Sequence, residues 1–341
     1  MLYVVIIFLG LSILLYVLLG GADFGAGIVE ITTPSRMQDR IRTTTYQTIG
    51  PIWEANHMWL IITIVILFVG FPSVYALLST HLHIPLLLML FGIIGRGTAF
   101  VFRHYDAVQD DMQRVYNLIF TVSSFVTPFF LGLIFGALVG GEIDRDAVGF
   151  LDAFVWPWLN GFAVSVGMFT VTICGFLAAV FLVGESENER EKAFLVRRSR
   201  MFILATVLAG GLVFLAAELQ KVPLVGLLIG EWITLGILLL ATVAMIMLWI
   251  QLPTAGRLPC RTLAGFVVTA ILAAFGYHYF PDLVITSAGE NLTLFNAAAI
   301  GKPIETLAWA LLIGSIFILP SLGYLIYSFQ KDKSLNAKTR A

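Results

Sequence analysis

The fold is decided by a stretch near the N-terminus, residues 2–27, which reads LYVVIIFLGLSILLYVLLGGADFGAG. Its apolar run has the length that an α-helix needs to cross a bilayer, about 20 residues. The run ends in a glycine-rich segment that contains one carboxylate, Asp23. Ionisable side chains at membrane depth are costly, and they face a bundle interior or a wet path. The stretch therefore predicts a membrane-spanning helix that carries a functional acid.

Similar apolar runs recur along the whole chain. Of its 341 residues, 59% are hydrophobic and 12% are charged, whereas an ordinary soluble domain is about 25% charged. We expect an all-α polytopic membrane protein, with residues 1–341 as a single integral membrane domain of two four-helix bundles plus one peripheral helix. The nine predicted spans are approximately 2–27, 51–71, 84–104, 116–139, 158–183, 201–217, 225–250, 262–280 and 307–328. The first is expected to be retained, because it lacks a basic region and a small-residue cleavage site.

Basic residues alternate from loop to loop, and this sets the orientation of the spans. Of the 20 lysines and arginines, Arg96 falls inside a span, and only Arg145, Lys221 and Lys302 belong to the loops after spans two, four, six and eight. The other sixteen belong to the remaining loops and the C-terminal tail. Because positively charged loops stay cytoplasmic, we expect the N-terminus outside and the C-terminus in the cytoplasm.

Composition also excludes several classes of protein. The formal net charge is −1, so the basic surface of a nucleic-acid-binding protein is absent. The two cysteines, Cys174 and Cys260, lie in a predicted span and in a basic loop. They suggest neither a disulfide framework nor a metal cluster, and we expect no metal ligands in this chain.

Charged residues gather in the half of the membrane nearest the cytoplasm. Asp23 lies near the inner end of the first span, and Glu54 lies about 5 Å into the second at a rise of 1.5 Å per residue. Arg96 in the third span lies about 10 Å from Arg103 by the same rise, and Arg103 falls at the inner interface. Helices joined by short connections tend to be neighbours. We therefore expect Asp23, Glu54 and Arg96 to lie near one another.

One interpretation of this cluster is a half-channel for protons from the cytoplasm. Such a route needs carboxylates that both accept and release a proton, and Asp23 and Glu54 are the candidates. It also needs polar stepping stones, for which Asn56, His57 and Thr63 are available on the second span. Glu54 and His57 are three residues apart and share a helix face.

The alternative interpretation is structural. Asp23 and Arg96 could form a buried ion pair that locks the first and third spans together, with Arg96 otherwise acting as a fixed countercharge. Glu54 could be a first-turn acid that the helix dipole favours. The sequence leaves both interpretations open.

The glycines and tryptophans of this region are expected to serve packing and anchoring. Gly21 and Gly25 have the small-xxx-small spacing that lets membrane helices approach closely. Trp53 and Trp59 are expected at or near the membrane interface, where tryptophan is enriched.

The chain is not expected to hold a haem by itself. Buried haems are usually held by histidine or methionine on spans, and only His57 is clearly within a span. No two histidines are spaced to clamp a haem between helices.

Three ordered motifs resemble a known family. Residues 20–27 (GGADFGAG), 50–60 (GPIWEANHMWL) and 96–103 (RGTAFVFR) are similar to the first three helix motifs of subunit II of the cytochrome bd quinol oxidases. Residues 292–298 (LTLFNAA), followed by Thr306 and Leu307, resemble the last outer loop of that subunit. The resemblance covers the chain from end to end.

The resemblance implies a subunit of a respiratory complex in the bacterial cell membrane. Subunit I of this family carries two b-type haems and one d-type haem, oxidises quinol and reduces oxygen to water. The protons for water come from the cytoplasm, so the enzyme builds a proton-motive force without pumping. Subunit II supports subunit I and supplies part of the proton path, and the residues that match that path here are Asp23 and Glu54.

Several points depart from the family pattern or stay open. Many relatives have a carboxylate at the position of Val101, where this chain is apolar. The connection between spans six and seven, about 218–224, is too short to be the quinol-oxidising loop of subunit I. The type of quinone, a structural quinone, a small single-helix subunit and the oligomeric state are not decided by any motif. A stand-alone transporter or channel, and a pure assembly scaffold, are the alternative functions.

Overall fold

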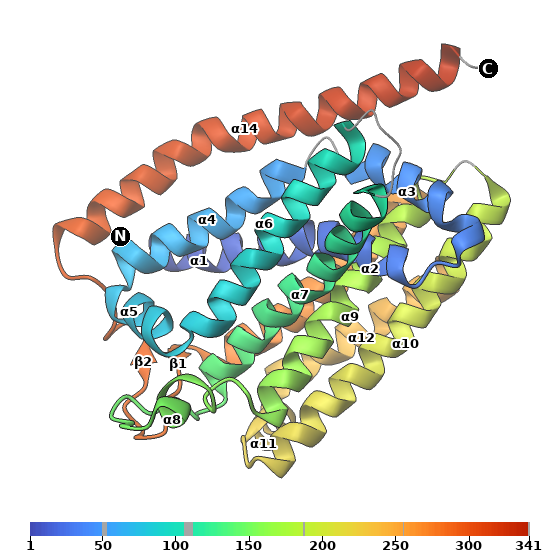
Figure 1. Ribbon diagram of the computed structural model, residues 1–341. Coiled ribbons are helices and arrows are strands. Elements are labelled where there is room, and N and C mark those ends of the chain that lie inside the picture. Colours follow the sequence, from blue (N-terminus) through green and yellow to red (C-terminus); the bar gives the residue numbers. More distant parts are fainter. Residues whose placement is uncertain (50–52, 106–111, 187, 255, 340–341) are drawn as a thin grey trace.

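The structure of the protein is a computed structural model that describes residues 1–49, 53–105, 112–186, 188–254 and 256–339. Long helices lie side by side in it, and the two termini lie at opposite ends of the bundle (Figure 1). We call the end with helix α3 (Ser35–Ile49) and the C-terminus the α3 end. The opposite end, with the N-terminus and a small β-hairpin, is called the hairpin end.

The first half of the chain begins with a continuous helix in three parts. These are α1 (Leu2–Leu15), the π-helical turn η1 (Tyr16–Gly20) and α2 (Gly21–Ile31). After α3 follow α4 (Trp53–Gly70), α5 (Pro72–His81), α6 (His83–Tyr105) and α7 (Met112–Val139).

The second half has further long helices and the hairpin. Its helices are α8 (Phe150–Phe154), α9 (Gly161–Val183), α10 (Glu189–Leu219), α11 (Leu224–Gly230), α12 (Trp232–Gln251), α13 (Arg257–Tyr279) and α14 (Lys302–Thr339). Strands β1 (Asp282–Val284) and β2 (Leu292–Thr293) pair antiparallel between α13 and α14.

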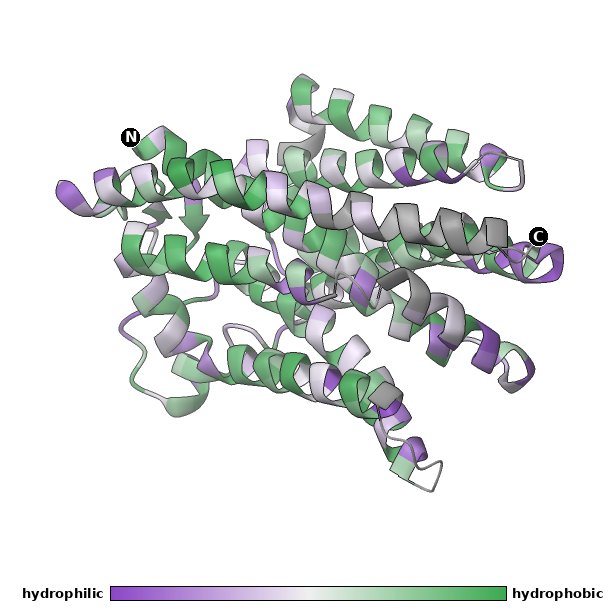
Figure 2. Ribbon diagram, turned by 90° about the horizontal axis from the view of Figure 1, so that it is seen from above, coloured by the Kyte–Doolittle hydropathy of each residue, from purple (hydrophilic) through white to green (hydrophobic). Residues whose placement is uncertain are grey.

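The prediction of an all-α polytopic membrane protein is confirmed. Within the described residues, eight helices are long and apolar enough to cross a membrane, and the count becomes nine if α4 and α5 are taken as one bent span. These two helices meet at 113°, where Pro72 begins the second of them. Figure 2 shows hydrophobic residues along the middles of the helices and hydrophilic residues toward their ends.

Several helices extend beyond the predicted spans, because hydropathy detects only the apolar part of a helix. Helix α10 begins at Glu189 rather than near residue 201, and the Asn188 side chain caps it by accepting a hydrogen bond from the Arg190 N–H at 2.9 Å. The seventh predicted span, 225–250, is interrupted at Glu231 between α11 and α12. The second span was predicted to start at residue 51, and residues 50–52 lie outside the described part of the chain.

The helices form two groups that meet along α2, α7 and α9. Helices α1, α2, α4, α6 and α7 belong to the first group, and α9, α10, α12 and α13 to the second. Helix α14 runs along the outside and packs on α1 and α4 (Figure 1). This arrangement matches the predicted peripheral helix.

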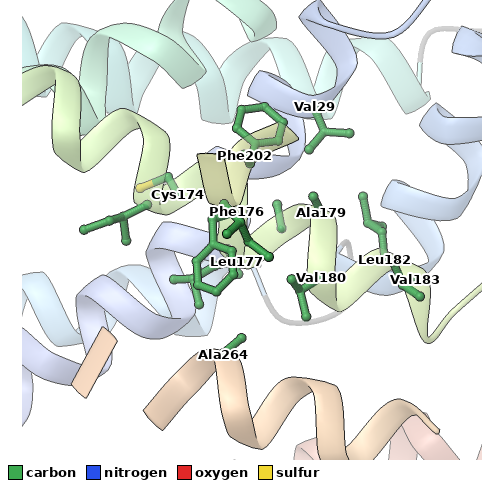
Figure 3. Close-up of a cluster of buried hydrophobic side chains, with 14 of the residues drawn as sticks. Val29, Cys174, Phe176, Leu177, Ala179, Val180, Leu182, Val183, Phe202 and Ala264 are labelled. Carbon is green, nitrogen blue, oxygen red and sulfur yellow. The ribbon is translucent and has the colours of Figure 1, made fainter. Parts of the chain in front are cut away.

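A close contact between α2 and α9 holds the two groups together. A Cβ atom built on Gly25 would lie 1.8 Å from the Cys174 carbonyl oxygen, so only glycine fits there. A Cβ atom on Gly21 would lie 3.4 Å from Cys174 Sγ, which is ordinary contact. Around this contact, Val29, Phe202 and Ala264 join the α9 side chains in a buried apolar cluster (Figure 3).

Candidate functional site

An acid and an arginine are paired deep inside the first group of helices. Asp23 follows the π-helical turn on α2, Arg96 lies on α6, and each is 1% exposed. Arg96 Nη1 donates to Asp23 Oδ2 at 2.6 Å, and Nη2 donates to Oδ1 at 2.7 Å. Nη2 also donates to the Asp23 carbonyl at 2.8 Å. The pair therefore has the bidentate geometry that makes arginine–carboxylate contacts strong.

The rest of the Arg96 side chain is also enclosed. Its Nε donates to Ser124 Oγ on α7 at 3.1 Å. The guanidinium carbon lies 5.1 Å from the centre of the Phe24 ring and 5.0 Å from that of Phe120, within the range of cation–π attraction. Arg96 thus joins α2, α6 and α7 through a single buried cation.

A second charged cluster, which the sequence analysis did not identify, lies two helical turns nearer the α3 end. Glu30 is fully buried at 0% exposure. It accepts hydrogen bonds from Arg103 Nη1 at 3.0 and 3.3 Å and from Arg42 Nε at 2.5 Å. Arg103 lies 4.4 Å from the centre of the Phe120 ring, so Phe120 contacts the arginines of both clusters.

A signal for this second cluster is present in the sequence. Glu30 follows Asp23 by seven residues, and Arg103 follows Arg96 by seven. Seven residues are about two turns, so both acids share one face of their helix and both arginines share one face of theirs. Glu30 lies beyond residue 27, where the first span was predicted to end, and it was therefore not considered.

His57 is the predicted residue of α4 that reaches the first pair. Its Nε2 lies 3.8 Å from Asp23 Oδ2, slightly longer than a hydrogen bond. The imidazole centre is 5.6 Å from that of the Phe24 ring and 6.2 Å from that of the Tyr16 ring. A titratable ring thus lies beside the carboxylate that Arg96 already binds.

The other predicted α4 residues differ in their exposure. Asn56 is buried at 4% exposure. Glu54 is exposed on the first turn of α4, and within the described part of the chain it has no hydrogen-bond or ion-pair partner. The structure does not describe the Trp53 side chain. Trp59 is 4% exposed and packs inside the bundle with Tyr16 and Phe24, and its depth near the membrane interface stays a prediction.

Two histidines lie against backbone carbonyls at the hairpin end. His81 Nδ1 lies 3.0 Å from the Ala153 carbonyl, and His83 Nδ1 lies 2.8 Å from the Thr80 carbonyl, both at the hairpin end. His57 faces Asp23 at a different depth. Among the residues that the structure describes, no group of three or more His, Cys, Asp or Glu side chains could hold a metal ion.

A solved structure has the same fold as this chain. The bd oxidase from Geobacillus thermodenitrificans contains a chain that aligns with this one at a TM-score of 0.76, over 96% of this chain and 98% of that chain. Their sequences are 19% identical, so this comparison shows the fold alone. The two chains therefore share one fold of membrane-spanning helices.

The sequence then places the chain in a family. It belongs to the cytochrome bd terminal oxidase subunit II family, whose model matches residues 1–329. It is 26% identical to the cytochrome bd ubiquinol oxidase subunit 2 of Bacillus subtilis, over 93% of this chain and 92% of that protein. It is 25% identical to the cytochrome bd-I ubiquinol oxidase subunit 2 of Escherichia coli K12, over 51% of this chain and 46% of the relative. The chain is thus a subunit of a bd-type quinol oxidase, and it has a subunit I as its partner.

Proposed function

We propose that this chain supplies part of the path by which protons reach the oxygen-reducing centre in subunit I. In this proposal subunit I carries two b-type haems and one d-type haem, which supply the redox chemistry when bound, and this chain ligates none of them. The complex lies in the bacterial cell membrane, with the α3 end toward the cytoplasm. The observation that carries the proposal is the imidazole of His57 beside the buried carboxylate of Asp23, 3.8 Å away.

The geometry suggests a division of roles among the path residues. Both carboxylate oxygens of Asp23 accept from Arg96, which makes Asp23 better placed as a fixed negative charge than as a carrier. His57 can pass a proton next to that charge, because one ring nitrogen of a neutral imidazole donates and the other accepts. Glu54 lies one turn nearer the α3 end on the same helix, where its exposed carboxylate can collect protons from water. The proposed order is Glu54, His57 and then the neighbourhood of Asp23.

The experiment compares variants in the assembled oxidase. Glu54→Gln and His57→Gln should lower the rate of oxygen consumption while the haem spectrum and the amount of complex stay normal. Glu142→Gln changes an acid in the loop at the hairpin end and serves as the control. Normal turnover by an assembled Glu54→Gln, His57→Gln double variant would remove both residues from the path.

A second candidate function is a pure assembly scaffold. The bidentate contact between Asp23 and Arg96 favours it, since one pair ties α2 to α6. This function predicts that Asp23→Asn reduces the amount of haem-containing complex, and that the complex which does form turns over at the normal rate per haem.

A further inference from the structure

Among the described residues, the buried polar atoms without a hydrogen-bond partner include two that belong to one side-chain cluster of the first group. They are the Tyr16 hydroxyl oxygen and Trp59 Nε1, and they belong to residues that are 3% and 4% exposed. Both side chains lie in one buried cluster with Phe24. Buried polar groups in proteins are normally paired with protein or with ordered water. Each of these atoms therefore points to an ordered water molecule as its partner.

The cluster adjoins the proposed proton path at His57. The Tyr16 ring is 6.2 Å from the His57 ring and opens the π-helical turn that leads to Asp23. Turns of this kind occur frequently at functional sites. Trp59 lies two residues after His57 on α4. The cluster thus begins where the path through His57 ends.

A pair of hydroxyls continues the polar groups beyond Trp59. The oxygens of Ser12 on α1 and Thr63 on α4 are 2.8 Å apart. Ser12 also donates to the Leu9 carbonyl at 2.9 Å, and Thr63 donates to the Trp59 carbonyl at 3.0 Å. These three oxygen–oxygen contacts have only two hydroxyl protons, one from Ser12 and one from Thr63. At any moment only two of the three contacts can therefore be hydrogen bonds. Rotation of either hydroxyl changes which two these are.

We propose that water fills the α1–α4 interface between Tyr16 and Trp59, and that this water extends the proton route from His57 to the hydroxyls of Ser12 and Thr63. The proposal rests on the proposed function and adds its next segment. Ser12 precedes Asp23 by eleven residues, which places it about 16 Å further toward the hairpin end. The route therefore runs well into the membrane along one helix interface.

The residues have different roles in this segment. The hydroxyls of Tyr16, Ser12 and Thr63 both donate and accept, so each can take one proton from a neighbour and release another without net change. The indole N–H of Trp59 only donates, and it orients a water molecule without carrying a proton. Trp59 is thus a positioning residue.

The first test uses variants that remove single oxygens from the assembled oxidase. Tyr16→Phe and Thr63→Val should each lower oxygen consumption by at least about threefold, a small part of the roughly 10²–10⁴-fold that a positioned proton-transfer group supplies. The haem content should not change, and the ratio of rates in H2O and D2O should rise. Tyr3→Phe, at an exposed position of α1, and Thr242→Val, at an exposed position of α12, are matched controls.

The second test is a structure of the assembled oxidase that resolves ordered water. A water molecule should lie within about 3 Å of the Tyr16 hydroxyl and of Trp59 Nε1, the usual length of a hydrogen bond. If no water lies there, or if both variants turn over normally, the inference is overturned.

The outcomes separate this inference from the proposed function. Slow turnover of Glu54→Gln and His57→Gln, with normal turnover of Tyr16→Phe and Thr63→Val, overturns only the segment beyond His57. Slow turnover of the Tyr16 and Thr63 variants, with normal turnover of Glu54→Gln and His57→Gln, overturns the inlet and the link from His57 to the hydroxyls. A variant that loses haem is replaced by Ser12→Ala, which removes a hydroxyl and leaves only a methyl group.

Discussion

Arg96 donates hydrogen bonds to three oxygen atoms of Asp23. Two of them are the carboxylate oxygens, at 2.6 and 2.7 Å, and the third is the backbone carbonyl oxygen, at 2.8 Å. The contact joins α6 to α2 inside the bundle, where neither side chain reaches solvent. It also fixes the orientation of the carboxylate beside His57. The same contact therefore bears on stability and on the proposed proton path, and variants have to separate the two.

Loss of one partner of this pair should destabilise the chain strongly. Arg96→Gln leaves the Asp23 carboxylate buried without its cation, and breaking a buried pair in this way costs about 3–5 kcal/mol. Thermal unfolding of the purified complex in detergent measures the effect. Arg145→Gln, in the exposed loop at the hairpin end, is the control and should stay within about 0.5 kcal/mol of the parent. An Arg96→Gln complex as stable as the control would show that the pair contributes little.

Glu54→Gln should slow turnover without changing stability. The Glu54 side chain is exposed and has no partner among the described residues, and surface substitutions of this kind change stability by about 0.5 kcal/mol or less. Oxygen consumption per haem and the unfolding temperature, measured on the same preparation, check both halves of the prediction. A parallel loss of stability and activity would contradict it and favour a scaffolding role for Glu54.

Gly25→Ala should disrupt the contact between the two groups of helices. The added methyl would overlap the Cys174 carbonyl at 1.8 Å, so α2 and α9 would have to separate. We expect a large drop in the yield of folded protein, measured by size-exclusion chromatography of the detergent extract. Gly10→Ala is the matched control, because nothing lies within 4 Å of its added atom. Alanine is a better helix former than glycine by about 1 kcal/mol, so this control should be neutral or stabilising.

Glu30→Gln should loosen helix α3. The substitution removes the charge that pairs with Arg42 from α3 and with Arg103 from α6. Trypsin should then cleave faster at Arg36 and Arg40, which lie exposed on α3. Asp39→Asn is the control. The Asp39 side chain, which pairs with Arg42, is 94% exposed, and exposed ion pairs contribute about 0–1 kcal/mol to stability. Equal cleavage of the two variants would mean that Glu30 does not hold α3.

The architecture could be predicted from the sequence because a helix that crosses lipid must be apolar over about 20 residues. Apolar length marked the spans, and the pairing of Asp23 with Arg96 was one of the two interpretations offered for these residues. Glu30 was missed because the end of a hydrophobic run does not mark the end of a helix. The packing of Trp59 against Tyr16 and Phe24 inside the bundle was not predicted, because the preference of tryptophan for the interface says nothing about its neighbours.

Other features could not be predicted because they depend on contacts between distant segments. The 113° bend between α4 and α5 and the pairing of β1 with β2 have only weak local signals. The approach of His57 to Asp23 depends on how α4 rotates against α2, which no periodicity in one helix specifies.

Phe120 has one further consequence. Its ring contacts the guanidinium groups of both Arg96 and Arg103. One aromatic ring therefore lies between the Asp23–Arg96 pair and the second charged cluster. Arg103 binds Glu30, which also binds Arg42 of α3, whereas Arg96 binds Asp23. The surface helix and the buried carboxylate are in this way connected without a continuous chain of hydrogen bonds.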